Sequence, residues 1–137
     1  DPVDQAISPY AASKKAAELY CYVYHHLYGF NIACVRYFTV YGARQRPDLA
    51  IHKFTRLIAT GQSVPMYGDG GMARDYTYID DIVDGTWKAL LWTQEGHCCE
   101  LFNLGHGSPV RLDELIGMIG CALHKAPVIK HLPEQPE

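Results

Sequence analysis

The stretch Ser8–Tyr37, SPYAASKKAAELYCYVYHHLYGFNIACVRY, decides the fold, because it reads as a helix, a glycine stop and a strand in succession. Ser8 and Pro9 form a helix start, since a serine side chain accepts a hydrogen bond from a free amide and proline fits the first turn. The helix is expected to run from about Pro9 to Tyr28. Residues 31–37 are short and rich in β-formers, which predicts a buried strand.

Two side-chain patterns mark this first helix. Apolar residues recur at spacings of three and four, which predicts one buried stripe made of Ala12, Ala16, Leu19, Val23 and Leu27. Tyrosines are also abundant, at Tyr20, Tyr22, Tyr24 and Tyr28. They are expected to pack against the sheet or against a partner subunit rather than to stack on nucleic-acid bases.

The rest of the chain alternates strands with helices. Helices are expected at 49–60, from Asp80 or Asp81 to 93, and at 111–124; strands are expected at 64–67, 74–79, 100–104 and 128–131. Residues 38–48 and 105–109 are expected to be loops, and Gly68–Gly71 a hairpin turn. This alternation predicts an α/β protein with parallel strands.

Composition narrows the class of protein. The 137 residues carry a net charge of -3 and 20% charged residues, with no basic run, which argues against nucleic acid as a partner. There is no apolar stretch of roughly 18 residues and no signal-peptide pattern, so a soluble, cytoplasmic protein without a membrane segment is expected.

Cysteines and histidines do not suggest a metal site. None of the five cysteines forms a C-x-x-C pair, and Cys98 and Cys99 are neighbours. We expect the cysteines to be small buried hydrophobic residues in a reducing compartment. His25 and His26 are adjacent on a helix and point in different directions.

Tyr10 and Lys14 are the strongest candidates for chemistry. Residues four apart lie on the same face of a helix, roughly 5–6 Å apart at their β-carbons. A lysine ammonium at that distance favours a phenolate over a phenol, and the helix N-terminus adds partial positive charge. Such a pair could take a proton from a sugar hydroxyl while a neighbouring nicotinamide takes hydride.

Four motifs in order resemble one family. They are SPYAASKKAAE, VRYFTVYGARQRPD, GDGGMARDYTYIDDIV and FNLG, and together they span nearly the whole chain. The sequence is similar to the extended short-chain dehydrogenase/reductases that remodel nucleotide sugars. The resemblance implies NAD as cofactor and the C-terminal part of a Rossmann-type doubly wound parallel sheet, followed by a small substrate-binding α/β region.

The resemblance also implies roles for individual residues. The residue matching Tyr10 is the general base, and the residue matching Lys14 bonds the nicotinamide ribose. Residues matching Tyr37 and Phe38 lie beside the nicotinamide. Thr39 stands where many relatives have asparagine, and threonine there is more similar to the UDP-glucuronate 4-epimerases.

Two arginines are candidates for the anionic substrate. Arg74 matches the family arginine that holds the nucleotide diphosphate, and Arg46 precedes the second helix in the RPD motif. A guanidinium suits phosphate because its fork donates two parallel bonds. Asp75 and Asp81 are expected to be structural, with Asp75 orienting the arginine or the backbone and Asp81 capping a helix.

Several expected parts of the family lie outside this chain. The glycine-rich dinucleotide loop, the acid for the adenosine ribose and the serine or threonine that shares the sugar hydroxyl are expected within roughly 125 residues before Asp1. A late R-x-D nucleotide contact is expected after Glu137.

Gly68–Gly71 lacks the strand and helix context of a phosphate-binding loop. Residues 1–42 are therefore read as the end of the Rossmann part and 43–137 as mainly the substrate-binding region. Neither end of the chain looks like a natural domain boundary.

These expectations converge on one function with named rivals. The parent protein is expected to epimerise a UDP-hexose, preferably UDP-glucuronate, at C4 through a transient 4-keto sugar, and to form a homodimer through the helix that carries Tyr10. UDP-glucose 4-epimerase and nucleotide-sugar 4,6-dehydratase activities remain alternatives. From another class, the chain alone could be a noncatalytic remnant that packs against a partner. The isolated chain is expected to be inactive and to bind NAD weakly or not at all.

Overall fold

The computed structural model describes residues 6–96 and 99–133, which fall into two compact units. Unit 1 comprises Asp1–Tyr37 and Val83–Leu104, and unit 2 comprises Phe38–Ile82 and Gly105–Glu137. The chain therefore passes between the units three times. Three predicted features lie outside the described residues. They are the loop at the start of the chain, Cys98 next to Cys99, and most of the loop at the end of the chain.

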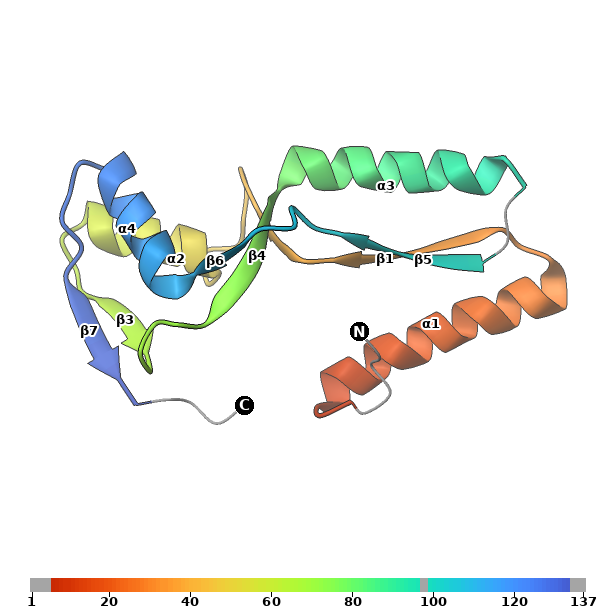
Figure 1. Cartoon of the computed structure of the whole chain (residues 1–137), viewed down its shortest axis with the longest axis horizontal. Coiled ribbons are helices and arrows are strands. Elements are labelled where there is room, and N and C mark those ends of the chain that lie inside the picture. Colours follow the sequence, from red (N-terminus) through yellow and green to blue (C-terminus); the bar gives the residue numbers. More distant parts are fainter. Residues whose placement is uncertain (1–5, 97–98, 134–137) are drawn as a thin grey trace. The chain divides into compact units, whose positions relative to one another are not determined.

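Unit 1 has three layers. The strands β1 (Ile32–Tyr37) and β5 (Cys99–Leu104) pair in parallel, with Ile32 opposite Cys99 and Tyr37 opposite Leu104. The helix α1 (Pro9–Tyr28) lies on one face of this pair and α3 (Ile79–Gln94), which enters unit 1 at Val83, lies on the other (Figure 1). Helices on both faces of parallel strands are the arrangement of a doubly wound α/β protein, which confirms the predicted fold class.

The bounds predicted for α1 are confirmed, but its buried stripe is wrong. Leu19 is 59% exposed, and the other four stripe residues are exposed as well. The partly buried positions belong to a different face, which lies against β1 and carries Ala11, Lys15, Glu18, Cys21 and His25. The four tyrosines of α1 are also exposed, so their predicted packing on the sheet is wrong, and their packing on a partner subunit stays a prediction. Apolar periodicity identifies a helix face that is expected to be buried, but it does not identify the surface that buries it.

The cysteines are less uniform than predicted. Cys21, Cys34 and Cys99 are half-buried in unit 1, whereas Cys121 is exposed, so the prediction of burial is wrong there. Burial, a hydrogen bond that the Cys34 thiol donates to Cys21 and the nearby charges of Cys21 and Cys99 raise the pKa of Cys34 to about 12. Within the described residues, no three histidines, cysteines or acids group to hold a metal ion.

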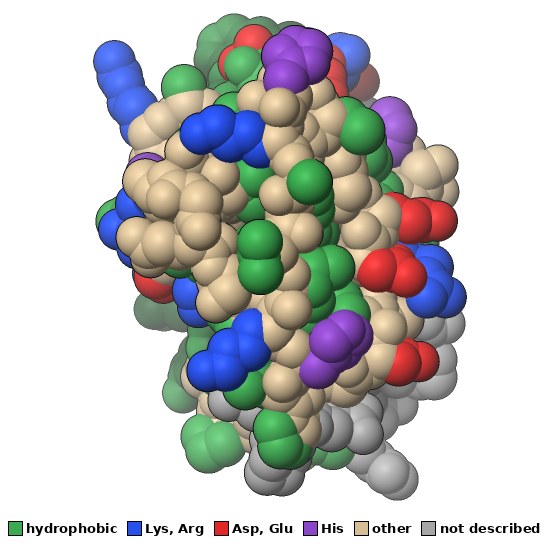
Figure 2. Space-filling model, turned by 90° about the vertical axis from the view of Figure 1, so that its left-hand side faces the viewer, with side chains coloured by type: hydrophobic (Ala, Val, Ile, Leu, Met, Phe, Trp, Pro, Cys, Tyr) green, Lys and Arg blue, Asp and Glu red, His purple; other side chains and the backbone are tan. Residues whose placement is uncertain are grey.

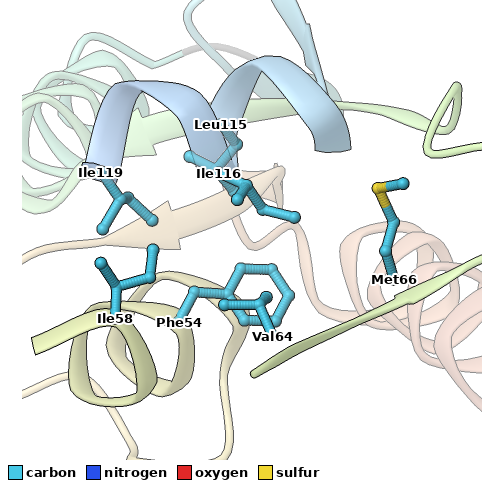
Figure 3. Close-up of a cluster of buried hydrophobic side chains, with 7 residues drawn as sticks. All are labelled: Phe54, Ile58, Val64, Met66, Leu115, Ile116 and Ile119. Atoms are coloured by element: carbon cyan, nitrogen blue, oxygen red, sulfur yellow. The ribbon is translucent and has the colours of Figure 1, made fainter. Parts of the chain in front are cut away.

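Unit 2 has its own hydrophobic core. The helices α2 (Ala50–Ala59) and α4 (Leu112–Ala122) pack together, next to the parallel pair β3 (Val64–Tyr67) and β7 (Ile129–Leu132). Figure 3 shows buried side chains of α2, α4 and β3, with those of the two helices facing each other. The buried cluster consists of Phe54, Ile58, Val64, Met66, Leu115, Ile116 and Ile119. The apolar face predicted for the second helix is confirmed, since Ile51 and Leu57 pack against this cluster.

A second sheet in unit 2 differs from the prediction. The strands β2 (Thr39–Tyr41), β4 (Ala73–Tyr78) and β6 (Pro109–Arg111) form it in the order β2-β4-β6. β2 lies within the predicted loop at 38–48, and β6 begins where the loop at 105–109 was predicted to end, so neither strand was foreseen. β4 pairs with β2 in parallel but with β6 in antiparallel orientation. Each of these two strands has three residues, which is too short for a periodic signal.

Two smaller predictions also need correction. Gly68–Gly71 is a turn, but β3 and β4 belong to different sheets, so it is not a hairpin turn. Asp80 and Asp81 lie in the first turn of α3, which begins at Ile79, so neither caps the helix. Their negative charge still suits a helix N-terminus.

The surface carries both signs of charge. Figure 2 shows basic side chains spread over one face and acidic side chains gathered toward one of its edges. None of the helices among the described residues combines the length and the apolar character needed to span a membrane.

Candidate active site

The first turns of α1 hold Tyr10 and Lys14 side by side. The Oγ of Ser8 accepts a hydrogen bond from the Ala11 amide at 3.1 Å, so this serine caps the helix as predicted. The Lys14 Nζ lies 5.4 Å from the centroid of the Tyr10 ring. Tyr10 is 72% exposed, so its hydroxyl is open to a substrate. The predicted juxtaposition on one helix face is confirmed.

An ion pair anchors the middle of this helix to the neighbouring strand. Arg36 of β1 donates two hydrogen bonds to the Glu18 carboxylate, at 2.6 and 2.7 Å, and Lys15 lies 3.5 Å from the same carboxylate. These hydrogen bonds lower the pKa of Glu18 and raise that of Arg36. A forked guanidinium–carboxylate pair fixes orientation as well as distance. It therefore sets how α1 lies on the strand that ends at Tyr37.

Tyr37 closes β1 at its carboxyl end. Its ring is half exposed, and its hydroxyl lies 3.1 Å from the hydroxyl of Thr86 on α3. Ligands of open α/β sheets bind outside the carboxyl ends of parallel strands. Tyr37 therefore lies at the end of the strand pair where a dinucleotide would be expected.

Phe38 begins unit 2 and packs against a glycine. A β-carbon added to Gly105 would lie 2.7 Å from a Phe38 ring carbon, so no larger residue fits there without a shift. This contact gives a physical reason for the glycine of the FNLG motif. Phe38 remains about half exposed.

Thr39 and Arg74 lie on adjacent strands of the β2-β4-β6 sheet. Thr39 pairs in register with Tyr76 of β4, and Arg74 lies two residues earlier on that strand. Side chains alternate along a strand, so Arg74 and Tyr76 leave β4 on the same face. Burial raises the pKa of Tyr76, and the nearby charge of Arg74 acts in the opposite direction. Arg74 is exposed and forms no ion pair within the described residues.

Arg46 lies in the loop between β2 and α2. Its guanidinium donates two hydrogen bonds to Asp48, at 3.1 and 2.7 Å, and this interaction lowers the pKa of Asp48. Both side chains are exposed. The loop residues Gly42, Arg44 and Arg46 line a cavity of about 220 Å³ together with Ile79, among others. Arg46 is therefore next to a hollow, but its charge is already paired.

Asp75 has the structural role that the sequence predicts. Its carboxylate accepts hydrogen bonds from the backbone amides of His106 and Gly107. The partners His106 and Gly107 were missed, because hydrogen bonds between residues 31 and 32 positions apart leave no local pattern. The position of the FNLG motif shortly before them is the only hint in the sequence.

The predicted site residues fall into two sets. Tyr10, Lys14 and Tyr37 belong to unit 1, while Phe38, Thr39, Arg46 and Arg74 belong to unit 2. Within unit 1, Tyr10 and Lys14 are neighbours; within unit 2, Thr39 and Arg74 lie on paired strands. Each set has a coherent chemistry: a phenol beside an ammonium in the first, and hydroxyl and guanidinium donors for anions in the second.

Comparisons with known proteins find relatives that cover most of this chain. The model of the NAD dependent epimerase/dehydratase family matches residues 1–105. A UDP-glucuronate 4-epimerase of Thermodesulfobacterium geofontis is 48% identical over 118 residues, which cover 85% of this chain and 35% of that protein.

Solved structures give the same picture. The UDP-glucuronic acid 4-epimerase from Bacillus cereus, in complex with UDP-glucuronic acid and NAD, superposes with a TM-score of 0.87 at 36% identity, covering 96% of this chain and 42% of that one. The dTDP-glucose 4,6-dehydratase DesIV from Streptomyces venezuelae, with NAD bound, gives 0.83 at 30% identity, covering 96% and 40%. The chain thus spans less than half the length of the relatives that it matches.

Proposed function

The chain belongs to the NAD dependent epimerase/dehydratase family, and on that premise we propose that the protein containing it epimerises a UDP-hexose at C4. The observation that carries this proposal is the exposed Tyr10 with Lys14 5.4 Å from its ring, at the start of a capped helix. A base that must reach a sugar hydroxyl needs such exposure and such a neighbour.

The residues of unit 1 suit the nicotinamide end of NAD. Lys14 offers three donors for ribose hydroxyls, and Tyr37 offers an exposed ring at the carboxyl end of β1. Phe38 would flank the same group. When bound, NAD would accept hydride from C4 of the sugar and return it to the opposite face.

Tyr10 is proposed as the general base. Its phenolate would remove the proton from the C4 hydroxyl and give it back after the keto sugar has turned over. The Lys14 ammonium would stabilise the negative charge that develops on the Tyr10 oxygen during this transfer, and the α1 N-terminus would act in the same direction.

The substrate is proposed to be UDP-glucuronate. Arg74 would hold the diphosphate, because its guanidinium is exposed and has no acid paired with it among the described residues. Thr39 would donate to the sugar carboxylate or diphosphate, and Arg46 would add positive charge if Asp48 gave up its bonds. The relatives named UDP-glucuronate 4-epimerase support this choice over UDP-glucose.

Dehydratase activity is the second candidate, since the DesIV dehydratase has a similar structure. A 4,6-dehydratase would release water from the sugar and leave a keto product. Thr39, in place of the asparagine common in dehydratases, weighs against it.

A homodimer is proposed to cover the exposed apolar face of α1. Leu19, Val23 and Leu27 repeat at helical spacing, and such a face is costly to leave in water. The homodimer would be formed by the full-length protein.

The test uses the full-length protein with each UDP-sugar in turn. We expect turnover of UDP-glucuronate to its C4 epimer, and little turnover of UDP-glucose. Tyr10→Phe should lower turnover by about 10²–10⁴-fold, because it removes the base. Tyr22→Phe, an exposed position on the same helix, is the control and should have native activity. Full activity of Tyr10→Phe would exclude the mechanism, and a keto product would indicate the dehydratase instead.

The isolated 137-residue chain is expected to have no epimerase activity and weak or no NAD affinity. Calorimetric titration with NAD tests this, and micromolar affinity would contradict it.

A further inference from the structure

The carboxylate of Asp75 is buried in unit 2, and no cation of the described residues forms an ion pair with it. Asp75 is only 8% exposed, and the ion pairs of the described residues involve other acids. A buried charge is strongly destabilising unless hydrogen bonds compensate it. The hydrogen bonds that this carboxylate accepts therefore indicate what it does.

All of these hydrogen bonds come from two places, the loop before β6 and β4 itself. Oδ1 accepts from the His106 amide at 3.0 Å, and Oδ2 accepts from the Gly107 amide at 2.7 Å. The Thr77 hydroxyl donates to Oδ1 at 3.3 Å and accepts from the same His106 amide at 3.0 Å. Hydrogen bonds to an ionised acceptor are stronger than neutral ones. Asp75 therefore ties the loop firmly to β4.

The loop is shaped to approach the carboxylate. A β-carbon on Gly105 would lie 2.8 Å from Asp75 Oδ2, and Gly107 has a φ of +81°, which favours glycine. Pro109 lies opposite Asp75 in the antiparallel pair of β4 and β6, and proline has no N–H for the ladder. The side chain of Asp75 thus ties β4 to the loop that leads into β6, next to the position where Pro109 has no N–H to donate.

The residues on either side of Asp75 point to the other face of β4. Arg74 is one of them, and it lies opposite Val110 of β6. We propose that Asp75 is a positioning residue, which holds Arg74 in place for the substrate diphosphate by fixing β4 to the loop and to β6. This proposal rests on the function proposed above, in which Arg74 binds the diphosphate.

The experiment measures UDP affinity by calorimetry in the full-length protein. Arg74→Gln should weaken UDP binding by at least tenfold, and Asp75→Asn by about tenfold, because the new amide group meets the Gly107 N–H as a donor. If Asp75 acts through Arg74, the double variant should bind within about twofold of Arg74→Gln alone. Asp80→Asn, an exposed acid on α3, is the control and should bind UDP as the native protein does.

The outcomes separate the two proposals. Native UDP affinity in Arg74→Gln would overturn both the role of Arg74 and the positioning role that depends on it. Native affinity in Asp75→Asn beside a weakened Arg74→Gln would overturn the positioning role alone. If the double variant lost affinity for UDP by the product of the two single losses, the positioning role would also be overturned. Such a result would mean that Asp75 and Arg74 act independently.

A second pair of variants keeps the test decisive if Asp75→Asn does not fold. Thr77→Val keeps the shape and the carboxylate but removes the hydroxyl, and it should weaken UDP binding by about threefold, while Thr77→Ser should restore it. NAD affinity and melting temperature report on folding. If Thr77 has a purely structural role, Thr77→Val should lower the melting temperature, but folded Thr77→Val and Thr77→Ser should bind UDP equally well. That result would overturn the proposal.

Discussion

Units 1 and 2 contain similar elements but bury them differently. Every buried residue among those described belongs to unit 2, which has a closed core between α2, α4 and β3. Unit 1 has two strands and two helices with only partly buried side chains, and most of the exposed large hydrophobic side chains lie in it.

The difference shows what holds each unit together. Unit 2 is stabilised by the removal of apolar surface from water, at about 25 cal/mol per Å². Unit 1 relies on its strand pairing and on the Glu18–Arg36 ion pair, and its apolar helix faces are open to other surfaces. The proposed general base, Tyr10, therefore lies on unit 1, the unit whose stability depends more on contacts with other surfaces.

The largest expected effect comes from a cavity in the core of unit 2. Ile116 is 0% exposed, and Ile116→Ala should lower the free energy of unfolding by about 2–5 kcal/mol. Leu19→Ala, on the exposed stripe of unit 1, should change it by less than about 0.5 kcal/mol in the isolated chain. Urea denaturation of both variants measures this. A comparable loss at Leu19 would contradict the contrast between the units.

An intermediate effect is expected where a glycine is packed closely. A β-carbon on Gly42 would lie 2.5 Å from the Ile79 Cγ2, at a φ of +149°. Gly42→Ala should therefore cost about 1–3 kcal/mol. Gly29 of unit 1 has a φ of +68° and open space around it, so Gly29→Ala should cost only the backbone strain of about 1 kcal/mol.

Thermal unfolding of the two glycine variants makes the comparison. Gly117→Ala is a suitable control, because among the described residues no atom outside the neighbouring backbone of α4 itself lies within 4 Å of the added carbon. It should be stabilising by up to about 1 kcal/mol, since alanine is the better helix former. Equal losses at Gly42 and Gly29 would mean that unit 2 is no more tightly packed than unit 1.

The smallest effect is expected for the ion pair of unit 1. Glu18→Gln should cost less than about 1 kcal/mol at neutral pH, because the pair is partly exposed to solvent. The Arg36 hydrogen bonds lower the pKa of Glu18 from its ordinary 4.5, so the native pair stabilises the fold above that pH. Its contribution should disappear as the pH falls through 4.5 and below the lowered value.

Unfolding at a series of pH values checks this prediction. The difference between native and Glu18→Gln proteins should shrink in acid, whereas a difference that grew in acid would have the wrong sign. Lys88→Ala breaks the exposed pair with Asp84 and is the control, with no measurable change expected.

The sequence predicts elements that are long or bounded by strong signals. The bounds of α1 follow from Ser8, Pro9 and Gly29, and those of β3 from the glycines Gly61 and Gly68 on either side of it. It does not predict β2 and β6, whose three residues become strands only by pairing with β4. Periodicity also does not show which helix face is buried, so the apolar stripe of α1 was predicted to be buried but is exposed.

The same limit applies to the site. Tyr10 and Lys14 could be paired from sequence because four residues of helix fix their separation. Arg74 could be singled out by its motif, but the network around Asp75 depends on a loop thirty residues away. A local pattern carries no information about such contacts.

Because the chain passes between the units three times, each unit is completed only by a later segment of the chain. Ile32 pairs with Cys99, and Val64 pairs with Ile129, so the two pairings interleave along the chain. During synthesis at about 5–20 residues per second, β1 must wait several seconds for its partner strand. Throughout that delay the edge of β1 that pairs with β5 is without this partner, so it is open to chaperones and to aggregation.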